Sequence, residues 1–159
     1  MPLELNATAG YDDVFWTNVL KKIEALINDS STYGHVYIAP GIQDESPQSV
    51  RIWGDSAESD TLKHSEWIKR YNANISLYMI SESPTENFYK SFYEQSEILY
   101  QVMANNGNIS GALGWYDGKV EDIVYDELDP LEEGVDGLHK ASFDFSCLVN
   151  RITTATINL

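Results

Sequence analysis

The chain has 159 residues and a formal net charge of −15, from 25 acidic and 10 basic residues. This length fits one domain with a core large enough to need no disulfide or metal, and the acidity argues against binding nucleic acid by phosphate neutralisation. The single cysteine excludes a disulfide within the chain and a cysteine-based zinc site. Because the N-terminus lacks the features of a secretory signal and no apolar run has the length of a membrane helix, we expect a soluble, non-secreted protein.

Two helices are predicted from the spacing of apolar residues. The first covers residues 12–29, where we expect Asp12 to cap the start. Its apolar residues recur at three- and four-residue spacing: Phe15, Trp16, Val19, Leu20, Ile23, Leu26 and Ile27. The second begins at Ser83, Pro84 and Glu86, which match the cap, first helical and capping-box positions. Its predicted apolar face comprises Phe88, Tyr89, Phe92, Tyr93, Leu99, Tyr100 and Met103.

Between these helices the sequence predicts short strands at 35–41 and 50–55, then a long one within 67–83. The long segment alternates apolar with polar residues, which is typical of a sheet with one face on a core and one in water. We expect the acidic, polar segment 55–66 to be a loop.

After the second helix we expect strands around 112–116 and 120–126, with Asp117-Gly118 as the hairpin turn between them. The last predicted strand is the most regular in the chain. Its apolar positions are Ala141, Phe143, Phe145, Cys147 and Val149, and Leu148 is the one exception to the alternation. We therefore interpret Cys147 as a packed thiol and not a nucleophile.

The predicted order is helix, strands, helix, strands. Hairpin-capable strands between helices favour an α+β fold over a doubly wound parallel sheet. We expect a mostly antiparallel β-sheet with two main helices packed on one face. Residues 1–159 are expected to form a single domain, in which 1–10 and 153–159 are flexible or arm-like.

No pattern in the sequence indicates catalysis or metal binding. The three histidines, His35, His64 and His139, lack a second histidine or a glutamate at metal-ligand spacing. Nucleotide-binding glycine loops and a serine nucleophile elbow are absent from the sequence. The acidic segment 126–137 contains Pro130 and lacks the alternating register of a calcium loop. We therefore expect no enzyme, no cofactor and no metal.

The remaining candidates are surface contacts. Aromatic residues beside polar loops are typical of protein–protein interfaces, although each one can equally cap the end of a core. The candidate interface residues are Trp53, Trp67, Trp115 and Tyr116. The candidate acidic lumen or partner surface comprises Asp55, Glu58, Asp60, Asp126, Asp129, Glu132 and Glu133.

In architecture, the chain resembles the tail-terminator (tail-completion) proteins of long-tailed bacteriophages over about residues 11–152. The resemblance rests on the helix at 12–29, the HVYIAP strand, the NANISLYMIS strand and the helix FYKSFYEQSEILYQVM. The end matches best: DIVYDELDPLEEGVDGLHKASFDFSCLVNRI resembles the closing strand, acidic loop and long alternating strand of that family.

The resemblance implies a structural virion protein that forms a hexameric ring at the neck-proximal end of the tail tube. Such a ring ends polymerisation of the tube and provides the surface that joins the head. The implied partners are other copies of the chain, the tail tube protein and head–tail connector proteins, without a membrane. DNA would only pass through, which an acidic lumen favours. The implied location is the virion, and the host cytoplasm during assembly. No family residue can be carried over as a named contact.

A different class of protein is also consistent with the charge and size of the chain. A small acidic immunity or inhibitor protein would bind a basic toxin or nuclease, because acidic inhibitors are steered electrostatically onto basic sites. Self-assembly distinguishes these two hypotheses, since an inhibitor is expected to be monomeric or dimeric. A third alternative is an enzyme without a recognised motif, which would require a concave pocket with convergent polar groups.

Overall fold

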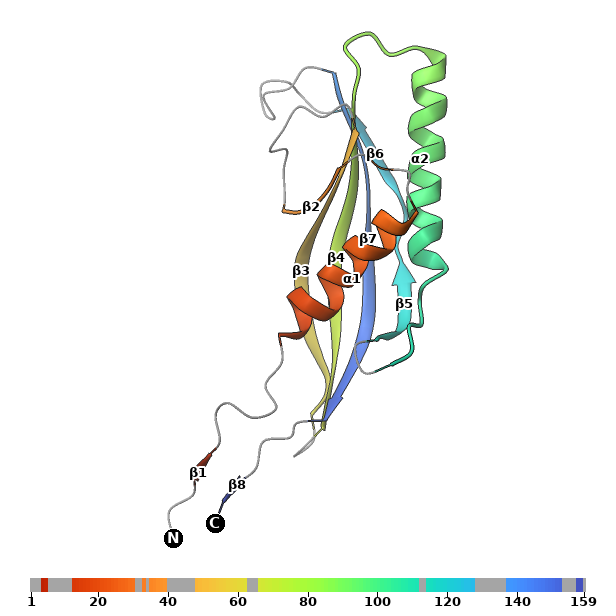
Figure 1. Cartoon of the computed structure of the whole chain (residues 1–159). Coiled ribbons are helices and arrows are strands. Elements are labelled where there is room, and N and C mark those ends of the chain that lie inside the picture. Colours follow the sequence, from red (N-terminus) through yellow and green to blue (C-terminus); the bar gives the residue numbers. More distant parts are fainter. Residues whose placement is uncertain are drawn as a thin grey trace.

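The computed structural model has the predicted α+β fold, a six-stranded, mostly antiparallel mixed sheet with two helices (Figure 1). It describes residues 4–5, 13–30, 33, 35–39, 48–62, 66–111, 114–127, 137–152 and 157–158. Of these, residues 4–5, 60–62, 66, 151–152 and 157–158 are described by their backbone alone.

Three long antiparallel strands form the centre of the sheet: β3 (Gln48–Leu62), β4 (Glu66–Ile80) and β7 (Leu138–Ile152). β4 lies between the other two and pairs with β7 along its whole length. The prediction of a loop at 55–66 was wrong, because β3 continues to Leu62. Its register shifts at Gly54/Ser56 and at Ser59/Thr61, so two bulges allow this polar segment to stay paired with β4.

Shorter strands complete the two sides of the sheet. β2 (Val36–Ile38) runs parallel to β3, while β5 (Tyr116–Val120) and β6 (Val124–Glu127) pair one after the other with the outer edge of β7. The predicted hairpin at Asp117-Gly118 was therefore wrong. Asp117 has a φ of 52° and lies at a register shift within β5. Gly118 donates its N–H to the Gly107 carbonyl at 2.8 Å, so this pair forms a bulge against a neighbouring loop.

Both helical segments lie on one face of the sheet, as Figure 1 shows. The first consists of η1 (Val14–Leu20), a π-helix, and α1 (Lys21–Asp29), and the second is α2 (Glu86–Ala104). The caps differ from the prediction: Asp13 accepts from the Trp16 N–H, and Thr85 accepts from the Phe88 N–H. Trp16 is exposed and Asn18 is buried, because the wider turn of the π-helix shifts which side chains face the sheet.

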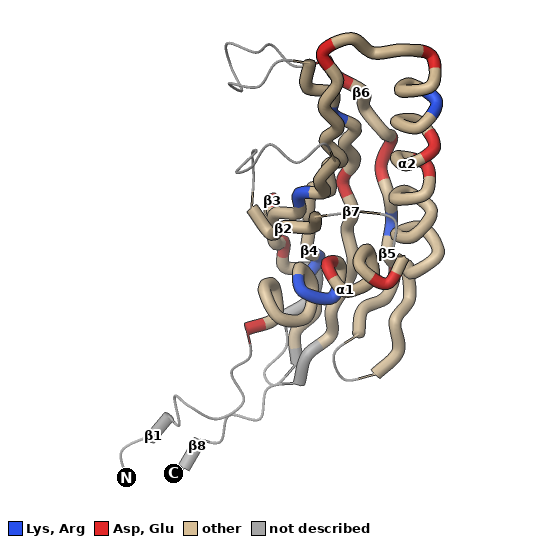
Figure 2. Tube along the Cα trace, turned by 45° about the horizontal axis from the view of Figure 1, so that its top comes forward, with Lys and Arg blue, Asp and Glu red and all other residues tan. Residues whose placement is uncertain are grey.

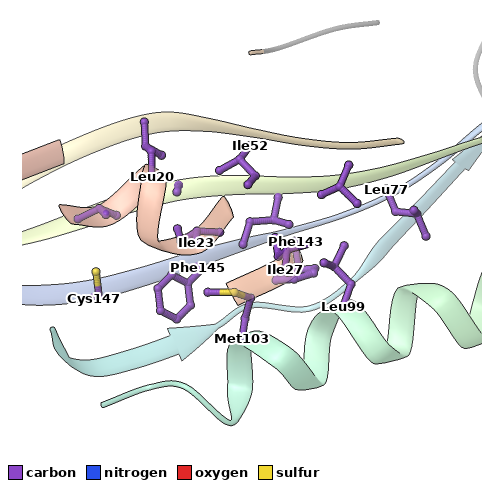
Figure 3. Packing of buried hydrophobic residues seen from close by; sticks show 14 of the residues in the cluster. Leu20, Ile23, Ile27, Ile52, Leu77, Leu99, Met103, Phe143, Phe145 and Cys147 are labelled. Atoms are coloured by element: carbon purple, nitrogen blue, oxygen red, sulfur yellow. The ribbon is translucent and has the colours of Figure 1, made fainter. Parts of the chain in front are cut away.

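The core lies between this face and the helices (Figure 3). β7 contributes the predicted alternating set, and all five of its members are buried: Ala141, Phe143, Phe145, Cys147 and Val149. They pack with residues of the helices and of β3 and β4, including Ile23, Ile27, Leu99, Met103, Ile52 and Leu77. Phe15 packs edge-on against Tyr71 at 5.0 Å between ring centroids, directly over Gly54.

The ends of the chain meet in a short ladder. β1 (Glu4–Leu5) pairs antiparallel with β8 (Ile157–Asn158). The other residues of the predicted flexible ends, 1–10 and 153–159, lie outside the described residues.

Candidate interaction surfaces

The face of the sheet opposite the helices, here called the open face, carries a network of polar side chains. Asn74 donates from Nδ2 to Asp144 Oδ1 at 3.0 Å and accepts from the Ser76 hydroxyl at 2.7 Å. Asn72 donates from Nδ2 to Ser56 Oγ at 2.8 Å. These bonds link β3, β4 and β7, and cross-strand polar pairs of this kind help to fix the register of a sheet.

A charged cluster continues the open face toward β5. Arg70 donates to Ser146 Oγ at 3.0 Å and to the Asp117 carboxylate at 2.5 Å, and Lys119 Nζ lies 3.6 Å from the same carboxylate. The hydrogen bond from Arg70, helped by the nearby Lys119 charge, lowers the pKa of Asp117. This cluster connects the bulge of β5 to the centre of the sheet.

Trp53 lies on the open face, on the opposite side of β3 from Val50 and Ile52 as its phase predicts. It is half-buried, and Lys140 Nζ lies 5.8 Å from the centroid of its ring. Nearby, Arg51 is fully buried, and its guanidinium stacks on the Tyr37 ring at 4.1 Å. The open face around Trp53 is therefore partly covered and not a bare aromatic patch.

The other three candidate aromatics have different surroundings. Trp67 is half-buried on the helix side of the central strand β4, and Lys69 Nζ lies 5.3 Å from its ring centroid. Trp115 is only 2% exposed, and its indole N–H donates to the Asn106 carbonyl at 2.8 Å. Tyr116 is exposed, opposite Leu148 in the register. Trp115 therefore belongs to the core and offers no surface to a partner.

The structure separates the candidate acids. Asp55 and Glu58 are exposed on β3, where Asp60 also lies at the second bulge, and Asp126 is exposed on β6. β3 and β6 lie on opposite sides of the β4–β7 pair, so these acids form two surfaces and not one. Asp129, Glu132 and Glu133 lie outside the described residues.

The first acidic surface is the outer edge of β3. β2 pairs with β3 only from Val50 to Ile52, and within the described residues no strand pairs with the next stretch of this edge. Every residue from 54 to 59 is exposed. A strand edge offers backbone N–H and C=O groups to another chain, and bulges and charges limit such pairing to suitable partners.

The second surface includes the predicted Asp126, but the groove in which this residue lies was not predicted. It is the groove between α2 and β6, which is lined by tyrosines and carboxylates and contains two cavities of about 400 Å³ and about 160 Å³. Tyr93, predicted to face the core, is 47% exposed here beside Tyr125, which is 40% exposed. Figure 2 shows acidic residues on both α2 and β6. The only signal in the sequence was the uneven mix of tyrosine and glutamate on the helix.

Cys147 is fully buried, which confirms the prediction of a packed thiol. This burial raises the pKa of the thiol to about 12. In the described part of the chain, no group of three or more His, Cys, Asp or Glu side chains is placed to hold a metal ion.

No protein-family model and no curated protein matched the sequence. None of the helices in the described ranges combines the length and apolar character needed to cross a membrane.

Proposed function

We propose that this chain is a non-catalytic assembly protein whose copies form a closed ring, in the manner of a phage tail terminator. The observation that carries the proposal is the outer edge of β3. Residues 54–59 are exposed, and this stretch pairs with β4 on its inner side while no described strand pairs with its outer side. A closed ring needs two different, complementary surfaces on each subunit, and a strand edge can supply one of them.

Charge supports the same proposal. The chain has a net charge of −15, so each subunit of a ring would be strongly acidic. A ring built from such subunits has acidic walls, past which DNA slides without binding. Its proposed neighbours are the tail tube and the head–tail connector, and its proposed location is the neck-proximal end of the virion tail.

The test is the mass of the protein in solution, measured by light scattering over a concentration series at low and high salt. We expect a species six times the chain mass of 17.9 kDa, favoured at higher salt because salt screens repulsion between acidic subunits. The double variant Asp55→Lys/Glu58→Lys should abolish this species. The matched control Glu82→Lys/Glu121→Lys changes two exposed acids away from the edge by the same total charge and should retain it.

A strict monomer at every concentration and at both salt levels would count against the ring and support a second candidate, an acidic inhibitor of a basic protein. The groove between α2 and β6 favours this alternative, because it combines exposed tyrosines with carboxylates. Co-purification of a basic toxin or nuclease with the monomer would then be the expected result.

A further inference from the structure

We propose that the smaller cavity between α2 and β6 is a binding site for the positively charged head of a lysine or arginine side chain from a partner protein. The cavity has a volume of about 160 Å³ and is lined by Tyr89, Phe92, Tyr93, Tyr125, Asp126, Glu127 and His139. A cavity of this size has room for the head group of one side chain.

Aromatic rings make up most of its walls. Tyr93 and Tyr125 meet edge to face at 5.1 Å between ring centroids, and Phe92 lies 5.9 Å from Tyr125. The register pairs Tyr125 with Ala141, whose small side chain leaves space for the tyrosine ring above the sheet. Ring faces carry negative electrostatic potential, so a pocket of this kind attracts cations.

One polar atom among the residues that line the cavity is buried and has no partner among the described residues. His139 is 3% exposed and lies 4.9 Å from Phe88 and 5.5 Å from Tyr89 between ring centroids. Its Nε2 has no hydrogen-bond partner among the described residues. An orphaned buried polar atom is costly, and in a neutral imidazole protonated on Nδ1 this nitrogen accepts an N–H from a guanidinium or ammonium group.

A carboxylate lies on the strand beside this histidine. Glu127 pairs with His139 in the register, which puts both side chains on the helix side of the sheet, and Glu127 is exposed. Charges on the flanking elements have the same sign. α2 carries Glu86, Glu94 and Glu97 against Lys90 alone, and Lys90 pairs with Glu94 at 3.9 Å. The site therefore combines ring faces, a hydrogen-bond acceptor and negative charge, which together match a cationic head group.

The volume of the cavity and the negative charge around it indicate which kind of ligand it can bind. A drug-sized ligand needs a pocket of about 300 Å³ or more, so a single side chain fits this volume better. The carboxylates repel anionic ligands, and the surrounding exposed tyrosines offer the type of surface on which a protein partner packs. The larger cavity, lined by Glu97, Tyr100, Asp122, Ile123 and Tyr125, shares Tyr125 with this one, so a basic segment bound at the first can extend to the second.

The probe for the test is the blocked peptide acetyl-Gly-Arg-Gly-amide, and its control is the same peptide with citrulline in place of arginine. Citrulline keeps the size and shape of the side chain and removes the charge. NMR titration should show the arginine peptide shifting the ring signals of His139 and Tyr125, with the citrulline peptide binding at least tenfold more weakly. Equal binding of the two peptides, or no shift with either, would overturn the proposal.

Two surface variants locate the site. Tyr125→Ala and Glu127→Gln should each weaken binding of the arginine peptide, by about three- to tenfold, because each removes one attractive group from a cation site. Glu58→Gln makes the same change in net charge on the far side of the sheet and should leave the affinity unchanged. If Glu58→Gln weakens binding as much as Glu127→Gln, the peptide is attracted by the net charge of the whole chain and not by this cavity. The proposed site would then be wrong. Because the peptide tests one pocket directly, its outcome is independent of whether the chain forms a ring.

Discussion

Replacing Trp115 by alanine distinguishes a core role from an interface role for this residue. The side chain is 2% exposed, its ring centroid lies 5.5 Å from that of the fully buried Phe145, and its indole N–H is bonded to the Asn106 carbonyl at 2.8 Å. The substitution removes all three contributions: the buried aromatic surface, the ring contact and the hydrogen bond.

The expected loss of stability is large. Truncating a buried aromatic side chain to alanine costs about 3–5 kcal/mol, against a total stability of about 5–15 kcal/mol for a domain. Trp115→Phe keeps an aromatic ring but loses the hydrogen bond, which costs about 1–2 kcal/mol because water can reach the half-buried Asn106. Trp53→Ala, at a half-buried site on the open face, is the control and should cost less than Trp115→Ala.

The assay is urea unfolding followed by far-UV circular dichroism, since fluorescence changes when a tryptophan is removed. Light scattering of each variant reports self-association in parallel. The reasoning is refuted if Trp115→Ala unfolds within about 0.5 kcal/mol of the parent, as substitutions at ordinary surface sites do, while self-association is lost. That result would indicate that Trp115 contacts another copy of the chain and does not stabilise the core.

Three further predictions follow from the packing. Gly54→Ala should destabilise the chain by about 1–3 kcal/mol in urea unfolding, because the new Cβ lies 2.7 Å from Phe15 Cζ. The double variant Gly54→Ala/Phe15→Ala should cost less than the sum of its single variants, and strict additivity would contradict the clash. Cys147, whose pKa burial raises to about 12, should resist maleimide at mildly alkaline pH until urea unfolds the chain, as judged by mass spectrometry; rapid labelling of the folded protein would contradict this. Because its folded-state pKa is lowered, Asp117 stabilises the fold above the ordinary carboxyl pKa of about 4, and this contribution is lost as the pH falls through the lowered value. The urea midpoint of Asp117→Asn should therefore fall less in acid than that of the parent, and parallel curves would exclude the contribution.

The sequence predicted the fold where a single periodicity acts over many residues. The alternation from Ala141 to Val149 placed one face of β7 on the core, and the helical spacing found both helices. Hydrophobic burial determines these patterns, so they can be recognised in one sequence without knowledge of the tertiary contacts.

The errors arose where tertiary contacts override local signals. Asp117-Gly118 has the composition of a hairpin turn. In the structure these residues instead form a bulge, and the Gly118 N–H donates to the Gly107 carbonyl in a neighbouring loop. The polar segment after Gly54 looks like a loop because its bulges and exposed edge suppress the alternation that marks a strand. The groove at Tyr125 and His139 joins residues from α2, β6 and β7, and only the register brings them together. The composition of each segment does not predict which distant residues come together in the folded chain.

The position of β7 in the chain has a consequence for the kinetics of folding. β4 needs β7 to cover its second edge, and both β5 and β6 pair with β7, not with each other. During synthesis, the β3–β4 hairpin can close early, but β5 and β6 have no partner until residues 138–152 have been made. Pairings between distant segments form slowly, and unpaired edges aggregate in the meantime. The sheet can therefore be completed only after its last long strand has been made. A chain that stops before this strand leaves one edge of β4 unpaired, next to the apolar face that β7 would have extended.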